Sequence, residues 1–387
     1  MPALFLVLPL LLSTALGAQG PLPPATGTAG VAGETRTVSG RVMRGSADSP
    51  QPVTGQMVVL HRISADASGP IDSVRTPASG AYRFSYRLEG PRSMYIVSAR
   101  YAGVAYFTAP LRERAVASPD ADVTVYDTTS AGFPLTIRGR HVVIAPADQG
   151  GVRRVVDVYE VANDSNRTLV AGAGPTWRVK LPEGAREPGS TGGDLPPEAF
   201  RFSDGNADLL VPVPPGARQV VLTYAIPAGS RVAMPVTEGT SMLEVLVEGT
   251  GATVSGAGLT AEDTVSLEGR TFQRFTASRV AAGASFVVAG SNNWSGRAGR
   301  VALIAVAIIA VALGIVIGRR GAGRGGTVEQ ARPASDALAR EIAALDNVYS
   351  EPERQSGAGG EYYRSRRAAF IGQLVEAQAV EDREDAT

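Results

Sequence analysis

The side chains that could do chemistry are few in this sequence. The chain of 387 residues has two histidines, His61 and His141, one lysine, Lys180, and no cysteine. Without cysteine there is no disulfide, no thiolate nucleophile and no thiolate ligand for zinc. A metal site with several histidines is impossible within one chain, and Schiff-base or Ser–Lys catalysis would depend on Lys180 alone. The inventory therefore favours a protein that is not an enzyme.

Both histidines lie in segments that alternate like strands. Neither begins the His-x-x-Glu pattern of a zinc peptidase, because Ser64 and Ile144 stand three residues further on. A lone histidine in a strand is more often structural than catalytic. We expect His61 at a structural or surface position and His141 on a solvated strand face beside Arg140.

Two pairs of aspartates, Asp120 with Asp122 and Asp204 with Asp208, are the nearest approach to a calcium loop. Calcium takes six or more oxygen ligands, and neither pair has a third acid at a suitable spacing. The sequence also lacks a Gly-x-Ser-x-Gly turn and a phosphate-binding loop. Basic and acidic residues balance at 37 each, so no field attracts nucleic acid. We expect no catalytic residue, no metal, no cofactor and no nucleic-acid partner.

The N-terminal residues have the pattern of a secretory signal peptide, which we place at residues 1–18. An apolar stretch from Leu4 to Leu12 is followed by small residues. No Lys or Arg precedes that stretch, and a short uncleaved anchor is the alternative. Residues 19–34 are rich in Pro, Gly, Ala and Thr without periodicity, which predicts a flexible lead-in.

A second apolar segment covers residues 301–318, and Val301–Ile317 has no polar side chain. As a helix it would extend about 26 Å, slightly less than the hydrocarbon core of a bilayer. We expect one transmembrane helix in contact with membrane lipid, flanked by Trp294 outside and by Arg319 and Arg320 inside. After a signal peptide, this predicts a type I cell-membrane protein with extracytoplasmic N-terminal domains and a cytoplasmic C-terminus.

Between these segments the pattern is that of β-strands, and the predicted fold class is mainly β. In residues 35–128 apolar and polar side chains alternate along several short segments, most clearly along Ala81–Leu88. Turn residues separate about seven such segments, which predicts a β-sandwich. Gly80 would allow a positive φ at the turn before two core aromatics, Tyr82 and Phe84.

This segment resembles the carboxypeptidase regulatory-like domain. The positions that carry the resemblance are a Gly-x-Val strand, a Pro- and Gly-containing loop, an apolar strand and Gly-x-Tyr-x-Phe: Gly40, Val42, Pro52, Gly55, Val58, Leu60, Gly80, Tyr82 and Phe84. The resemblance implies a prealbumin-like β-sandwich with a carbohydrate-binding-like fold. The domain accompanies some carboxypeptidases but is not itself catalytic.

Residues 133–290 predict a second, larger β-sandwich. Seven candidate strands alternate or are rich in β-branched residues, as along Arg218–Ile226. Residues 163–167 have the composition of a hairpin turn, and residues 183–199 that of a long surface loop. Two small sandwiches that meet near Pro214 are the alternative.

The C-terminal region predicts a basic, Gly-rich linker at residues 319–332 and a cytoplasmic helical hairpin at residues 333–380. Apolar residues recur at helical spacing along Asp336–Tyr349 and Glu361–Ala379, with a Gly-containing loop between them. The tail resembles a helical module of bacterial membrane proteins, some of them linked to cytochrome c maturation, at Glu341, Ile342, Leu345, Asp346, Glu361, Tyr362 and Arg366. Two short helices bury little alone, so the hairpin is a candidate site for a cytoplasmic protein partner.

Taken together, the sequence predicts a non-catalytic, single-pass protein of the bacterial envelope. Its two β-sandwiches would bind or scaffold a glycan or an envelope protein. The alternative is an accessory factor in envelope or cytochrome c assembly that acts through the tail.

The apolar segment at residues 301–318 gives the first testable prediction. We expect the full-length chain to sediment with membranes and to need detergent for extraction, because this segment buries its side chains in lipid. Ultracentrifugation of a cell lysate with and without detergent measures this. A full-length chain that stays in the supernatant without detergent would contradict the prediction.

Overall fold

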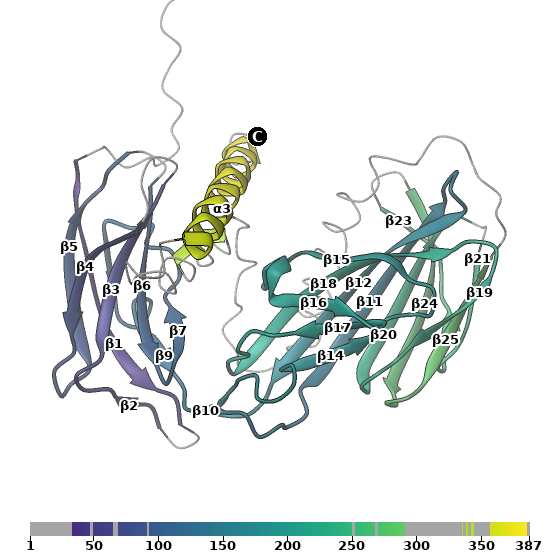
Figure 1. Ribbon diagram of the computed structural model, residues 1–387, viewed down its shortest axis with the longest axis horizontal. Coiled ribbons are helices and arrows are strands. Elements are labelled where there is room, and N and C mark those ends of the chain that lie inside the picture. The colour runs from purple at the N-terminus through teal and green to yellow at the C-terminus, as the bar shows by residue number, and fades with distance from the viewer. Residues whose placement is uncertain are drawn as a thin grey trace, which may run out of the picture.

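The computed structural model shows a mainly β protein with one long C-terminal helix, α3 (Gly357–Glu384) (Figure 1). The described residues are 33–46, 49–64, 69–90, 93–249, 252–267, 270–290, 335, 338–339, 342–343 and 357–384. The strands form two groups, which we name the first β body (Thr35–Thr129) and the second β body (Thr136–Gly290).

Several predictions from the sequence fall on residues that the structure does not describe: the signal peptide 1–18, most of the lead-in 19–34, the transmembrane segment 301–318, the linker 319–332, and the flanking residues Trp294, Arg319 and Arg320. Within the described ranges, no helix combines the length and the apolar character that crossing a bilayer requires. The membrane topology therefore stays a prediction.

The first β body consists of two sheets that face each other across one core. One sheet centres on β1 (Thr35–Arg44), which pairs with four strands: β2 (Gln51–Pro52), β5 (Ala81–Arg87), β8 (Ala115–Ala117) and β9 (Val123–Val125). The other sheet has the order β4-β3-β6-β7 and comprises β4 (Gly69–Arg75), β3 (Met57–Ile63), β6 (Met94–Tyr101) and β7 (Val104–Phe107). Side chains alternate across each strand, so each sheet gives one row to the shared core.

The Gly-x-Tyr-x-Phe motif lies at the turn and strand that enter this core. Gly80 has a φ of +70°, and Tyr82 and Phe84 on β5 are buried. The Tyr82 hydroxyl donates a hydrogen bond to the carbonyl oxygen of Ala121. A Cβ on Gly40 would lie 2.1 Å from that same oxygen, so the close approach of the two backbones requires glycine.

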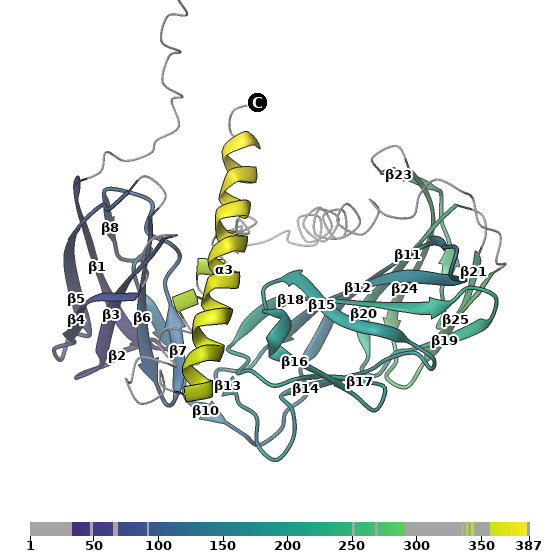
Figure 2. The same cartoon turned by 45° about the horizontal axis from the view of Figure 1, so that its top comes forward.

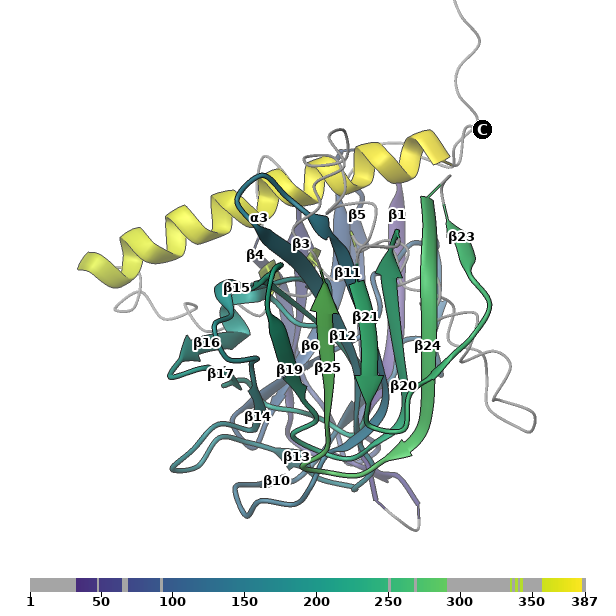
Figure 3. The ribbon, with the colours of Figure 1, turned by 90° about the vertical axis from the view of Figure 1, so that its right-hand side faces the viewer.

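The second β body is built on an eight-stranded sheet (Figure 3). Its order is β15-β18-β12-β11-β20-β24-β22, with β23 also paired to β24. The bounds are β15 (Arg186–Gly193), β18 (Gly216–Pro227), β12 (Val152–Asn163), β11 (Thr136–Ala147), β20 (Thr240–Glu248), β24 (Arg270–Val280), β22 (Thr260–Ala261) and β23 (Val265–Leu267). Long β-branched runs on β11, β12 and β18 explain their central place, because such side chains pack well on a pleated surface.

Two three-stranded sheets contribute to the same core. They are β14 (Trp177–Lys180), β17 (Asn206–Leu209) and β16 (Phe200–Ser203), in the order β14-β17-β16, and β19 (Arg231–Pro235), β25 (Ser285–Gly290) and β21 (Ala252–Gly256), in the order β19-β25-β21. One buried cluster runs from Leu135 to Val288 and includes Val213 and Val220 on either side of Pro214. This cluster therefore continues across that proline, and a smaller buried cluster, Val143, Val156, Val158, Val221, Leu246 and Phe272, lies apart from it.

Two loop predictions in this region are wrong. Residues 183–199 are not a loop throughout, because β15 and the short 3-10 helix η1 (Pro197–Ala199) lie within them. Backbone pairing with β18 overrides the turn-rich composition, and two register shifts accommodate the irregular strand. Residues 163–167 do not close a hairpin, since β12 pairs with β11 and β18 and the next strand, β13 (Thr168–Leu169), pairs with β10 (Thr128–Thr129).

The two β bodies are joined where β10 meets β13 (Figure 2). The Tyr106 hydroxyl of β7 lies 2.8 Å from the Thr168 hydroxyl and donates a hydrogen bond to the Tyr126 carbonyl at 3.0 Å. Thr168 is buried, and Val170 packs against the core of the first body. The two β bodies are therefore held together by side-chain contacts as well as by the chain that connects them.

The C-terminal region differs from the predicted hairpin at its loop. The second predicted helix is confirmed, but α3 begins at Gly357, so the four residues 357–360 expected in the loop are helical. Neighbouring backbone hydrogen bonds outweigh the low helix propensity of three glycines. Residues 335, 338–339 and 342–343, which fall at the predicted first helix, are also helical, and the rest of the expected loop lies outside the described residues.

The positive φ at Gly80 gives a prediction on stability. A Cβ there would lie 2.7 Å from the Val42 carbonyl oxygen, so Gly80→Ala adds a backbone clash to the strain of a positive φ. We expect a loss of about 3 kcal/mol in the free energy of unfolding. Gly55→Ala is the control, because Gly55 has a φ of +71° and open space around it, and it should cost about 1 kcal/mol. Equal losses in urea denaturation would contradict the argument.

Candidate functional site

The three-stranded sheet β14-β17-β16 places a set of polar side chains side by side on its outer face. Lys180 pairs in register with Asn206, which also pairs with Ser203. Because side chains alternate along a strand, Val179 and Ala207 between these positions point into the core, and both are buried. The core residues thus hold the polar row in place.

The β16–β17 hairpin closes through Asp204 and Gly205, which the sequence analysis did not recognise as a turn. Ser203 pairs with Asn206, so the loop has two residues, and their φ angles are +51° and +71°. Asp-Gly with two positive φ values is the preferred pair for a type I′ turn. The sequence contains the signal for this turn, which is Asp-Gly between two short segments in which apolar and polar residues alternate. The turn places Asp204 at the end of the sheet.

Beside this hairpin lies an open groove of about 480 Å³. Its walls are the hairpin and the segment between β14 and β15, and its lining includes Lys180, Glu183, Phe202, Asp204 and Asn206. Phe202 is half-buried and adds an aromatic surface. A concave site of this size with a few convergent polar groups is typical of small-ligand binding.

The charged side chains of the groove take part in no close ion pair with other described residues, although Asp204 acts electrostatically on Arg178. No ion pair joins Lys180, Glu183 or Asp204 to another residue in the part of the chain that the structure describes. The groove thus offers one ammonium, two carboxylates, a side-chain amide and a hydroxyl to a ligand. This arrangement can bind, but it holds no paired nucleophile and base.

Behind the polar row, two arginines close over one carboxylate. Arg178 binds Asp208 through two hydrogen bonds of 2.6 and 2.9 Å, and Arg201 adds one of 3.3 Å. Hydrogen bonds from these guanidinium groups hold the pKa of Asp208 below its usual range, although burial acts in the opposite direction. The two arginines thus fix Asp208 between the strands that flank it.

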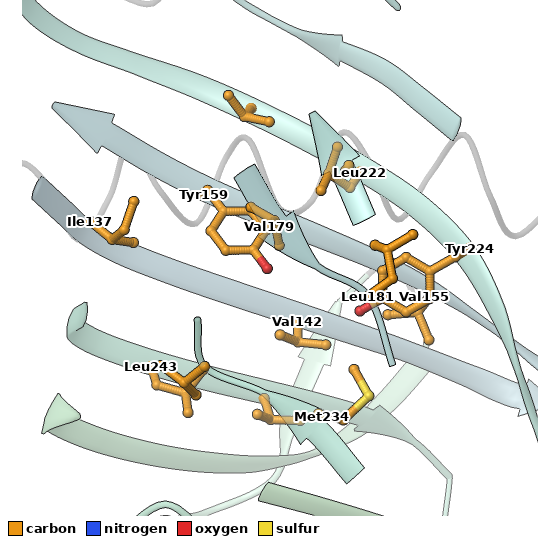
Figure 4. Packing of buried hydrophobic residues seen from close by; sticks show 14 of the residues in the cluster. Ile137, Val142, Val155, Tyr159, Val179, Leu181, Leu222, Tyr224, Met234 and Leu243 are labelled. Atoms are coloured by element: carbon orange, nitrogen blue, oxygen red, sulfur yellow. The ribbon is translucent and has the colours of Figure 1, made fainter. Parts of the chain in front are cut away.

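A second polar cluster is buried in the second body next to the apolar packing that Figure 4 shows, to which Tyr159 and Tyr224 belong. Arg140 donates two hydrogen bonds to Asp157, at 2.9 and 2.7 Å, and a third to the Pro235 carbonyl at 2.6 Å. Asp157 also accepts hydrogen bonds from the hydroxyls of Tyr159, at 3.1 Å, and Tyr224, at 2.8 Å. The Arg140 guanidinium lies 5.0 Å from the Tyr159 ring centroid.

This buried cluster is closed to ligands. The adjoining cavity, lined by Trp177 and Glu238, has a volume of about 10 Å³, which is room for about one water molecule. Burial raises the pKa of both tyrosines far above its usual value, so their hydroxyls stay protonated as donors. Burial alone would lower the pKa of Arg140, but the Asp157 carboxylate outweighs that effect and raises it. The cluster therefore joins strands within the core, where no ligand reaches it.

Both histidines are buried, which corrects the expected solvated face at His141. His141 lies 2.8 Å from Glu244, whose other oxygen accepts a hydrogen bond from Arg274 at 2.6 Å. Burial tends to raise the pKa of Glu244, but these two partners outweigh it and lower the pKa. His61 lies 2.8 Å from the Ser98 hydroxyl, a juxtaposition the sequence did not reveal. Ser98 is 1% exposed, so no substrate reaches it.

The remaining candidates from the sequence do not converge. Asp122 accepts hydrogen bonds from the Arg41 amide at 2.8 Å and from Ser118 in the first β body, whereas Asp204 lies in the second. Asp208 is held by arginines, and it does not share a site with Asp204. Across the described ranges, no three histidine, aspartate or glutamate side chains gather where a metal ion could bind.

Comparisons with known proteins identify no family. No protein-family model matches the chain. No curated protein is significantly similar to it in sequence. The functional argument therefore depends on the geometry of the chain itself.

The buried Arg140–Asp157 pair gives a prediction on stability. Asp157→Asn leaves the arginine charge buried without its counter-charge, so the free energy of unfolding should fall by about 3–5 kcal/mol. The control is Asp164→Asn, which removes the partner of Arg138 in a pair whose side chains are 51% and 49% exposed, and it should cost less than about 1 kcal/mol. Thermal denaturation compares the two. Similar costs would show that Arg140 does not depend on Asp157.

Proposed function

We propose that this chain is a non-catalytic binding protein whose second β body holds a glycan with an acidic group in the groove beside Lys180. The observation that carries the proposal is the groove itself, with unpaired charges on both of its walls. An exposed groove lined by a lysine, two carboxylates, an amide and a half-buried aromatic side chain has the chemistry that a polar ligand needs.

The position of Lys180, rather than the net charge of the groove, supports an acidic group on the ligand, because the lining carries one ammonium and two carboxylates. Arg178 and Arg201 are both paired with Asp208, whereas Lys180 forms no ion pair among the described residues. An anionic group of the ligand would meet Lys180 without having to displace an internal partner. Asp204 and Glu183 across the groove would accept hydrogen bonds from sugar hydroxyls. Phe202 would pack against the apolar face of a sugar ring.

We also propose that the first β body is a carboxypeptidase regulatory-like β-sandwich with a scaffolding role. Its positive φ at Gly80 and its buried Tyr82 and Phe84 support this. The two facing sheets have the layout of a sandwich. The signal peptide at residues 1–18 and the apolar segment at residues 301–318, both predicted from the sequence, support a setting in the cell envelope.

The groove gives a prediction on binding. The full-length protein should bind uronic acid-containing oligosaccharides on a glycan array in preference to neutral ones of the same length. Lys180→Ala should weaken that binding about tenfold, because a charge-assisted hydrogen bond is worth about 1.5 kcal/mol. Isothermal titration with the best acidic glycan measures the change.

Arg83→Ala is the matched control, since Arg83 is an exposed cation on β5 of the first body, away from the groove. It should leave the affinity unchanged. An array on which no acidic glycan binds, or a Lys180→Ala variant with unchanged affinity, would refute the proposed function.

A further inference from the structure

The sheet β4-β3-β6-β7 of the first β body is covered on both of its faces. One face contributes Leu60, Tyr95 and Val97 to the core between the two sheets. The opposite face, which a two-layer body leaves to solvent, carries Ile63, Met94 and Ile96. These three side chains are 0%, 8% and 0% exposed.

Strand β6 shows this most clearly. All six residues Met94–Ala99 are buried, with no alternation between buried and exposed positions. In an antiparallel sheet with one solvated face, buried and exposed side chains alternate along each strand, whereas a strand covered on both faces has consecutive buried side chains. Phe107 on the neighbouring β7 is half-buried beside the same patch. We name Ile63, Met94, Ile96 and Phe107 the outer patch.

The side chains that cover the outer patch come from the C-terminal region of the same chain. Phe370 and Leu374 of α3, four residues apart and therefore on one helix face, are 6% and 1% exposed and belong to the same cluster. The helical residues Ala339, Ile342 and Ala343 complete it. Figures 1 and 2 both show α3 alongside the strands of the first body.

The polar residues of α3 support this orientation. Glu376, on the opposite side of the helix from Leu374, is exposed, and so is Gln373 at the edge of the apolar face. Arg366 lies with its guanidinium 4.7 Å from the Phe370 ring centroid and forms an ion pair with Glu198 of the second body. The helix thus has one apolar face on the outer patch and a charged contact beyond it.

We propose that the outer patch is a helix-docking surface and that its occupant comes from the C-terminal part of the same chain, namely α3 together with the helical residues Ala339, Ile342 and Ala343. The complementarity is apolar on both sides, with Phe370 and Leu374 against Ile63 and Ile96. The inference goes beyond ligand binding in the groove, because none of these residues lines it.

The docking has a consequence for topology. The first β body and α3 touch only when both lie on the same side of a membrane. A single crossing by residues 301–318 would separate them. The proposal therefore replaces the predicted cytoplasmic tail with a C-terminal segment that shares the compartment of the β bodies.

Thiol labelling tests the docking, because the chain contains no cysteine and every label reports the introduced one. In purified full-length protein, Leu374→Cys should react with a maleimide at least tenfold more slowly than Gln373→Cys, its exposed neighbour on the same helix. Adding Ile96→Asp to Leu374→Cys should restore fast labelling. Equal rates for the two single variants would overturn the proposal.

A second labelling experiment tests the compartment in intact cells. With a membrane-impermeant maleimide, Gln373→Cys should react as readily as Ser85→Cys, an exposed position on β5 of the first body. If Gln373→Cys reacts only after the membrane is broken while Ser85→Cys reacts before, the tail lies across the membrane, and docking within the chain is refuted in favour of the type I topology. The glycan-binding test is independent of this outcome.

Discussion

The second β body depends on the buried ion pair between Arg140 and Asp157. The two side chains join β11 to β12. The hydroxyl of Tyr159 adds a second contact from β12, and the hydroxyl of Tyr224 connects β18 to the same carboxylate. The third arginine hydrogen bond reaches the Pro235 carbonyl on the facing sheet. A shift of one residue in the pairing of any of these strands would move its polar side chain to the other face of the sheet. The ion pair therefore favours one pairing register over others that would bury apolar side chains equally well.

The groove also depends on arginine–aspartate pairing, here at the protein surface. Arg178 and Arg201 close over Asp208 and tie the outer strands β14 and β16 to the central β17. With those strands fixed, Lys180 and Asn206 face the groove, while the Asp204–Gly205 turn forms its rim. The difference between the two clusters is solvent access: the buried one satisfies its own charges, and the groove leaves its charges for a ligand.

Much of the fold was predictable from local sequence. Alternation predicted β5 and nearly the whole of β18, because the period of two is set by strand geometry whatever the partner. The Asp204–Gly205 turn was equally readable and was missed. By contrast, β15 could not be found locally, since its glycines, proline and charged residues form a strand only through backbone pairing with β18. The sequence-derived solvated face at His141 failed because Glu244, its partner, is 103 residues away.

The sequence by itself determined the chemical inventory and the mainly β class. Absent cysteines, two separated histidines and one lysine limit catalysis and metal binding regardless of fold, since they are properties of composition. Only the tertiary structure decided which groups meet: Arg140 with Asp157, His61 with Ser98, and Phe370 with the outer patch. The physical reason is that strand pairing and burial act between residues distant in the chain. Alternation shows which side of a strand is apolar, but not which surface will cover it.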